Sequence, residues 1–226
     1  MTRYAVYGVP GIEPDAPAVA VGLRQAVEDW YDAHPAITVD PRRYGFHATL
    51  KAPFRLADGA SAAALVDGVA AFAAVRGPVV IPAVRPRAIG AFRALVPTTD
   101  APEIETLAAD VVRAFEPFRA PLTPDEVARR RPERLSARQR ELLDRHGYPY
   151  VLDEFRFHMT LTDSLRDPGG VDDAIASHFA AFDGADIPLT SLAVFVEPGP
   201  GARFEVHSVH PFAAAADESR DRSERT

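Results

Sequence analysis

The chain has 226 residues, a hydrophobic fraction of 47% and a formal net charge of −7 at pH 7. That length suits one compact domain or two small lobes sharing a core, and the composition is that of an ordinary soluble globular protein. The negative charge disfavours long nucleic acid as a partner, because such binding depends on neutralising phosphates. The chain contains no cysteine, which excludes disulfides and thiolate metal sites.

Hydrophobic runs along the chain are short. None approaches the roughly 20 apolar residues that a membrane span requires. The first residues lead directly into a strand-like segment and do not form an apolar stretch of signal-peptide length. We therefore expect a cytoplasmic protein without a membrane partner.

Hydrophobic periodicity predicts two successive segments of similar layout, each reading strand, helix, histidine-bearing strand, helix, strand. The first segment, 1–88, contains predicted strands at 4–9, 46–54 and 79–84 and predicted helices at 16–33 and 61–75. The second, 89–212, contains strands at 91–96, 155–162, 189–196 and 204–209 and helices at 101–115 and 171–182. The proline within 79–84, Pro82, suits an edge strand or a bulge.

The second segment is longer because of residues 121–150, which we expect to form an inserted helical hairpin. Thr123 and Pro124 form a helix-start signal, and Gly147 marks the end of the insertion. The insertion is rich in arginine, which indicates either a solvated face or a lid over an anionic substrate. Residues 213–226 are polar and lack periodicity, so a disordered tail is expected there.

One five-residue pattern, Phe-His-x-Thr-Leu, occurs twice, at 46–50 and at 157–161. For independent residues of this composition, the chance of two copies is roughly one in a million. A structural alternative is that a duplication left two similar core strands whose histidines only pack. Strand geometry favours a functional role, because side chains alternate between faces with a period of two. One face of each strand is apolar, and the other carries His47, Thr49 and Lys51 in the first strand and Arg156, His158 and Thr160 in the second.

This polar face suits hydrolysis at phosphorus. Two imidazoles with a pKa near 6.5 can serve as general base and general acid, each worth about 10²- to 10⁴-fold in rate. The hydroxyls of Thr49 and Thr160 can donate to phosphate oxygens. Lys51 and Arg156 could supply positive charge, or could be ordinary surface residues. A metallohydrolase would need carboxylates beside the histidines, and neither strand carries one on its polar face.

The motifs at 43–54 (RYGFHATLKAPF), 147–151 (GYPYV) and 154–162 (EFRFHMTLT) resemble the two-histidine phosphoesterase superfamily, and within it the subfamily encoded near phosphonate-degradation genes. The resemblance implies one bilobed α+β domain over 1–212. In it a pseudo-twofold duplicated unit forms two antiparallel sheets facing a central cleft, with helices outside. It implies catalysis by His47 and His158, phosphate binding by Thr49 and Thr160, and no metal or cofactor. The implied substrate is a small cyclic phosphate such as 5-phosphoribosyl 1,2-cyclic phosphate.

Further candidates for substrate binding are aromatic. Tyr44 precedes the first motif, and Tyr148 and Tyr150 end the insertion, where they could stack on a base or sugar. Tyr4 and Tyr7 are expected in core or rim packing. Two other functions stay open: an enzyme acting on RNA ends with 2′,3′-cyclic or 2′-5′ linkages, and a non-catalytic module binding nucleotides or sugar phosphates. The sequence leaves the oligomeric state undetermined.

Overall fold

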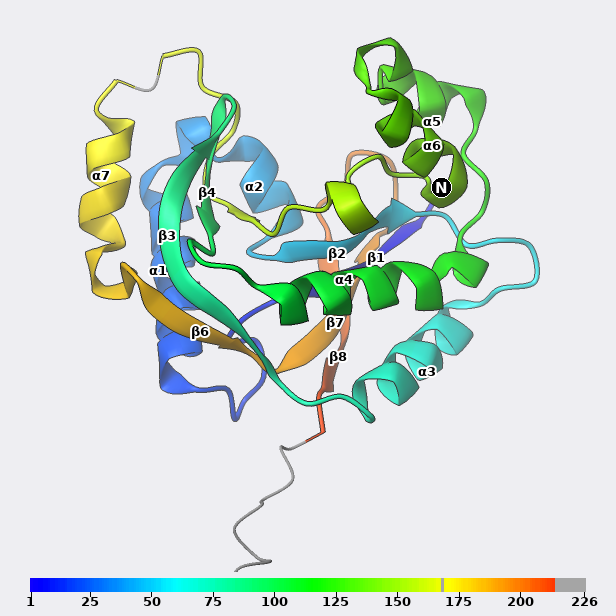
Figure 1. Ribbon diagram of the computed structural model, residues 1–226, viewed down its shortest axis with the longest axis horizontal. Coiled ribbons are helices and arrows are strands. Elements are labelled where there is room, and N and C mark those ends of the chain that lie inside the picture. The colour runs from blue at the N-terminus through cyan, green and yellow to red at the C-terminus, as the bar shows by residue number, and fades with distance from the viewer. Residues whose placement is uncertain (168, 214–226) are drawn as a thin grey trace, which may run out of the picture.

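The computed structural model describes residues 1–167 and 169–213 and contains one curled antiparallel sheet with helices packed around it (Figure 1). The strand order is β6-β3-β4-β5-β2-β1-β7-β8. The strands are β1 (Arg3–Gly8), β2 (Ala48–Phe54), β3 (Val79–Ile89), β4 (Phe92–Val96), β5 (Met159–Thr160), β6 (Ala185–Leu189), β7 (Ser191–Glu197) and β8 (Glu205–Pro211). The predicted α+β class with antiparallel pairing is confirmed.

The helices cover different parts of this sheet: α1 packs on β6, α3 on β7 and β8, and α4 on β2 and β3. None of the helices in the described ranges is long and apolar enough to cross a membrane. The helices are α1 (Ala18–Ala33), α2 (Val39–Tyr44), α3 (Ala62–Ala73), α4 (Pro102–Ala114), α5 (Pro124–Arg129), α6 (Ala137–His146) and α7 (Val171–His178), with 3₁₀ turns at Pro35–Ile37, Glu116–Phe118, Pro132–Arg134, Leu152–Glu154 and Ala180–Phe182. The expected tail lies, from residue 214 onward, outside the described residues.

The sequence analysis expected two facing sheets, whereas the strands of the structure follow one another in a single eight-stranded sheet. The short strand β5 causes this, because Met159 pairs with Ala48 of β2 on one side and with Leu95 of β4 on the other. The two sequence segments also interleave within the sheet. Strand β3 of the first segment pairs with β4 and β6, whereas β7 of the second segment pairs with β1.

Strand β5 is much shorter than the strand predicted at 155–162, and at its end side chains of α1 bond the backbone. The indole Nε1 of Trp30 donates to the carbonyl of Leu161 at 3.0 Å, and the hydroxyl of Tyr31 donates to the carbonyl of Thr160 at 2.6 Å. Buried carbonyls require a donor, and here two side chains supply it where a ladder partner is absent. Helix α1 therefore holds the second histidine segment in position.

The bulge expected from Pro82 is present. The pairing of β3 with β6 shifts between Ile81 and Val84, and Ala83 has a φ of 46°. The backbone N–H of Ala83 bonds the carboxylate of Asp186 at 2.9 Å, so the irregular residue keeps a partner. A bulge bends its strand, and β3 accordingly pairs with β6 along its first part and with β4 along its second.

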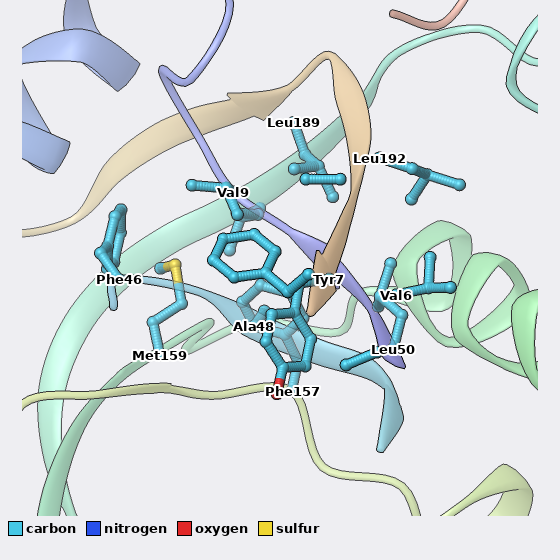
Figure 2. Close-up of a cluster of buried hydrophobic side chains, with 14 of the residues drawn as sticks. Val6, Tyr7, Val9, Phe46, Ala48, Leu50, Phe157, Met159, Leu189 and Leu192 are labelled. Atoms are coloured by element: carbon cyan, nitrogen blue, oxygen red, sulfur yellow. The ribbon is translucent and has the colours of Figure 1, made fainter. Parts of the chain in front are cut away.

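The predicted apolar faces of both histidine segments lie in the main hydrophobic core. Figure 2 shows these side chains packed with residues of β1 and β7 beneath the two segments. Burial of each large apolar side chain stabilises the fold by about 1.5–3 kcal/mol, so turning either segment over would be costly. The buried members are Phe46, Ala48, Leu50, Phe157, Met159 and Leu161.

The segment expected to be an inserted helical hairpin contains α5 and α6. Thr123 caps α5 through a capping box with Glu126, and Pro124 is the first helical residue. Helix α6 ends at Gly147, whose φ of 71° is a left-handed conformation that favours glycine.

Candidate active site

The two histidine motifs lie side by side in antiparallel register, with Ala48 directly opposite Met159. These are the middle residues of the two His-x-Thr triplets. Because antiparallel residue numbers run in opposite directions, continuing this register by one residue sets His47 opposite Thr160 and Thr49 opposite His158. Ala48 and Met159 point into the core, so period-two alternation turns these four flanking polar side chains to the other face.

Both imidazoles are oriented by the same local contact. The Nδ1 of His47 lies 2.9 Å from the carbonyl of Gly45, and the Nδ1 of His158 lies 2.8 Å from the carbonyl of Arg156. A carbonyl can only accept, so each Nδ1 carries a hydrogen and each Nε2 is left as the proton-accepting nitrogen, which at His47 lies 3.2 Å from the hydroxyl of Thr49. Gly45 ends α2 with a φ of 75°, which turns the chain into β2 and aims its carbonyl at the ring.

His47 is enclosed by aromatic rings. Its ring stacks on that of Tyr7 with centroids 3.9 Å apart, and Tyr44 lies 6.0 Å away. Burial lowers the pKa of His47 to about 4; the bond to Gly45 opposes this shift, and the charge of nearby His158 adds to it. Neutral imidazole therefore predominates at His47 near pH 7.

His158 lies beside Phe92, with ring centroids 5.7 Å apart. Burial lowers the pKa of His158 as well, and the hydrogen bond to the carbonyl of Arg156 opposes the shift. His158 lies close enough to His47 for its positive charge to lower the pKa of His47. The two imidazoles therefore form a coupled pair that prefers one proton to two.

A cavity of about 820 Å³ opens over this face, within the size range of small-molecule sites. Its lining comes from β1, β2, α2, the start of β4, the segment around β5, and the inserted hairpin. In Figure 1, α2 and the α5–α6 hairpin lie on opposite sides of the region above β2. The polar and aromatic residues of the lining include Arg3, Tyr7, Tyr31, Asp40, Arg43, Tyr44, His47, Thr49, Arg55, Phe92, Asp125, Glu126, Arg129, Arg130, Tyr148, Thr160 and Asp163.

The position of Lys51 corrects the sequence analysis, which placed this side chain on the polar face with His47. The register between β1 and β2 shifts between Thr49 and Lys51, inserting one extra residue into β2. Such a bulge breaks the period-two alternation, and Lys51 turns towards α4 instead. There its Nζ is buried, 3.2 Å from the carbonyl of Val112 and 2.7 Å from the carboxylate of Glu116.

The other substrate-binding candidates differ in whether they line the cavity. Tyr44 lines the cavity, stacked on Phe204 at 4.8 Å between centroids. Arg156 is exposed, outside the cavity lining, and precedes β5, so strand alternation does not place its side chain. Tyr150 is 47% exposed and also outside the lining, although its ring lies 5.6 Å from that of Tyr148, which does line the cavity.

Sequence reasoning missed two tyrosines at this site. Tyr7 is in the core, as expected, and its ring also supports that of His47 at the edge of the cavity. Tyr31 lines the cavity and anchors the backbone of Thr160. Both lie far from the motifs in sequence, and only the pairing of β1 with β2 and the docking of α1 bring them there.

The cavity is rich in ionic side chains. Arg3 and Arg43 both bind the fully buried carboxylate of Glu197, so this cluster keeps one excess positive charge at the cavity wall. Across residues 1–167 and 169–213, no group of three or more histidine, aspartate or glutamate side chains is placed to hold a metal ion.

Comparison with known proteins gives two kinds of match. Two curated relatives are both called "Ribose 1,5-bisphosphate phosphokinase PhnN". One, from Janthinobacterium sp. (strain Marseille), is 39% identical over 96% of this chain and 52% of its own length. The other, from Laribacter hongkongensis (strain HLHK9), is 40% identical over 73% of this chain and 38% of its own length. The chain thus spans about half, or less, of these relatives.

Among solved structures, the crystal structure of E. coli LigT complexed with NADP+ matches 94% of this chain and 98% of that chain, at 12% identity and a TM-score of 0.44. The family model described as "Protein of unknown function (DUF1045)" matches residues 49–205, which include Thr49 and Leu50 of the first motif and all of the second. By that match, the chain belongs to the DUF1045 family.

Proposed function

We propose that this protein is a two-histidine phosphoesterase that hydrolyses a small cyclic phosphate ester. The observation that carries the proposal is the register of Ala48 opposite Met159. Beside the paired motifs lies a cavity of small-molecule size, whose lining includes His47, Thr49 and Thr160, with His158 outside it. In-line displacement at phosphorus needs a base for the entering water and an acid for the leaving oxygen, and two imidazoles supply both.

The protonation of the pair suggests which histidine takes which role. The lowered pKa of His47 and the contribution of His158 to it mean that the first proton taken up by the pair resides on His158. Groups whose pKa values are pushed apart divide into base and acid. We therefore assign His47 as the general base and His158 as the general acid, each acting through its Nε2. The hydroxyls of Thr49 and Thr160 donate to the non-bridging oxygens as charge develops there.

The substrate we propose is 5-phosphoribosyl 1,2-cyclic phosphate. Water adds to phosphorus, its proton passes to His47, the bond from phosphorus to O2 breaks, and His158 protonates O2. The product is ribose 1,5-bisphosphate, the compound that appears in the names of both relatives, whose chains extend beyond the part that matches this protein. Cleavage at O1 would instead give a 2,5-bisphosphate, which those names do not fit.

Phosphorus NMR of the purified protein in a chelator-containing buffer tests the proposal. With 5-phosphoribosyl 1,2-cyclic phosphate, the cyclic ester signal is expected to be replaced by a monoester signal, which coupling to an anomeric proton assigns to the 1-position. The His158→Gln variant should leave the cyclic ester intact. Absence of turnover by wild-type protein, or turnover that survives His158→Gln, would overturn the proposal.

A comparison substrate separates the alternative functions. If nucleoside 2′,3′-cyclic phosphate is hydrolysed faster than the sugar cyclic phosphate, the enzyme acts on RNA ends. Tight binding of the sugar phosphate without turnover would make the protein a binding module.

A further inference from the structure

Two arginines of the inserted hairpin line the same cavity as His47, Thr49 and Thr160. Arg129 is the last residue of α5 and Arg130 follows it, and both line the cavity. The sequence left open whether arginines of this insertion are a solvated face or contact an anion. These two lie over the site, whereas Arg134 and Arg138, further along the insertion, lie outside the cavity lining.

The guanidinium groups of Arg129 and Arg130 have no ion-pair partner within the described part of the chain. Neither forms a salt bridge with any residue of 1–167 or 169–213. In contrast, Arg55 in the same lining is paired with Glu126 at 3.0 Å. Unpaired guanidinium groups beside a cavity present donors suited to phosphate.

The acidic side chains of the cavity differ in how they are engaged. Glu126 is paired with Arg55, and the carboxylate of Asp163 accepts the backbone N–H groups at the start of α2, at 2.8 and 2.9 Å. Asp40 and Asp125 remain, both at exposed positions. The formal charges of the lining therefore roughly balance, and what suits the hairpin side of the cavity to an anion is that the guanidinium groups of Arg129 and Arg130 have no ion-pair partner within the described residues.

Two tyrosines of the cavity lining lie beside the two ends of the proposed ligand path. The guanidinium of Arg130 lies 5.0 Å from the centre of the Tyr148 ring, which orients it. The ring of Tyr44 lies 6.0 Å from that of His47. Burial raises the pKa of Tyr148, so its hydroxyl stays protonated and can donate a hydrogen bond. A ligand with one anionic group at His47 and a second anionic group near Tyr148 would meet Arg130.

We propose that Arg129 and Arg130 form a second phosphate subsite, which holds a phosphate monoester that the enzyme does not cleave. The proposal rests on the proposed function, and it specifies the substrate class: a cyclic phosphate whose sugar carries another phosphate. A monoester bears about −1.5 to −2 charges at pH 7, more than a diester, and thus gains most from two guanidinium groups. The inserted hairpin thereby determines specificity, whereas the two strands carry the chemistry.

Two substrates differing only in the second phosphate test the subsite. Wild-type protein is expected to prefer 5-phosphoribosyl 1,2-cyclic phosphate to ribose 1,2-cyclic phosphate by roughly 100-fold in kcat/KM, the effect of about two charge-assisted hydrogen bonds. The Arg129→Ser/Arg130→Ser variant should lose most of this preference, mainly through a higher KM for the phosphorylated substrate. Arg134→Ser, an exposed arginine of the same insertion, is the matched control and should keep it. A preference unchanged in the double variant would overturn the subsite.

Binding measurements make the subsite testable independently of turnover. Calorimetry with ribose 5-phosphate is expected to show binding to wild-type and His158→Gln protein, and a drop of at least about tenfold in affinity in the double arginine variant. If ribose 5-phosphate binds in this way but no cyclic phosphate is hydrolysed, the subsite stands and the proposed function fails. If cyclic phosphate is hydrolysed without regard to the 5-phosphate, the function stands and the subsite is wrong.

Discussion

Ala48 and Met159 face each other across an antiparallel strand pair, and each is the central residue of a His-x-Thr triplet. Extended by one residue in each direction, this register would set each histidine opposite the threonine of the other motif. Neither central residue has a polar group in its side chain, and both are buried. Their role is to bring the two triplets into register while packing the core, and the chemistry proposed for the site depends on that register.

Substitution of either histidine should abolish most turnover. For His47→Gln and His158→Gln we expect kcat to fall about 10²- to 10⁴-fold with little change in KM, because each removes one proton-transfer step. Steady-state kinetics with 5-phosphoribosyl 1,2-cyclic phosphate measures this. His207→Gln, at an exposed position of the edge strand β8, should retain wild-type activity. Full activity in either His47 or His158 variant would contradict the mechanism.

Each threonine hydroxyl should contribute to stabilising the transition state. Thr160→Val keeps the side-chain shape but removes one donor, so we expect a loss of about 10²- to 10³-fold in kcat. Thr49→Val should act similarly, since the Thr49 hydroxyl lies 3.2 Å from the Nε2 of His47, beside the reacting group. Thr98→Val, at an exposed position outside the cavity lining, provides the comparison. Losses below threefold in both threonine variants would argue against phosphate binding there.

The low pKa of His47 predicts how stability changes with pH. Its pKa is about 4 in the folded protein and about 6.5 when unfolded, so between these values the unfolded state binds more protons. Stability contributed by this group is therefore complete above pH 6.5 and is lost as pH falls towards 4. The upper limit is about 3 kcal/mol, lowered by the partial exposure of the ring to the cavity.

Chemical denaturation of wild type and His47→Gln at pH 7 and pH 4.5 isolates this contribution, because titrating carboxylates are common to both proteins. We expect the free energy of unfolding to fall more steeply with acidification in the wild type. Equal slopes, or an NMR titration of His47 centred near 6.5, would show that the ring is not perturbed in this way.

Lys51 is predicted to matter for stability and not for substrate binding. Burial lowers the pKa of Lys51, with Glu116 opposing the shift. Although burial raises the pKa of Glu116, hydrogen bonds from Arg119 and Lys51 lower it on balance. Lys51→Met leaves the carboxylate with one fewer partner, at a cost of about 2–3 kcal/mol, below the range for completely buried pairs because Glu116 keeps some exposure.

A double-variant cycle checks this interpretation. Lys51→Met/Glu116→Gln should recover part of the lost free energy of unfolding, since no carboxylate is then left short of a partner and Arg119 keeps its bonds to the carbonyls of Ala120 and Arg145. The folded Lys51→Met protein should keep a KM close to that of the wild type. A KM raised tenfold or more, with unchanged stability, would return Lys51 to the substrate site.

Much of this site follows from local sequence rules. Alternation along each histidine segment predicted which side chains are buried, and Phe46, Leu50, Phe157 and Met159 are buried as expected. The helix signals at Thr123 and Gly147 also gave the limits of the inserted hairpin, because capping depends on a few neighbouring residues. The His-x-Thr pairs were recognisable for the same reason: all their information lies within five residues.

The tertiary structure decided the relationships between segments that are distant in sequence. The shift in register between β1 and β2 turned Lys51 away from the cavity, and bulges are set by the partner strand as much as by the strand itself. Stacking of Tyr7 on His47 and anchoring of Thr160 by Tyr31 likewise require the docking of β1 and α1. The sequence alone therefore determined which residues can do the chemistry. Strand pairing and helix packing decided which charged side chains reach the cavity. Contact between distant segments depends on strand register, and the period-two and helical patterns of the sequence do not specify that register.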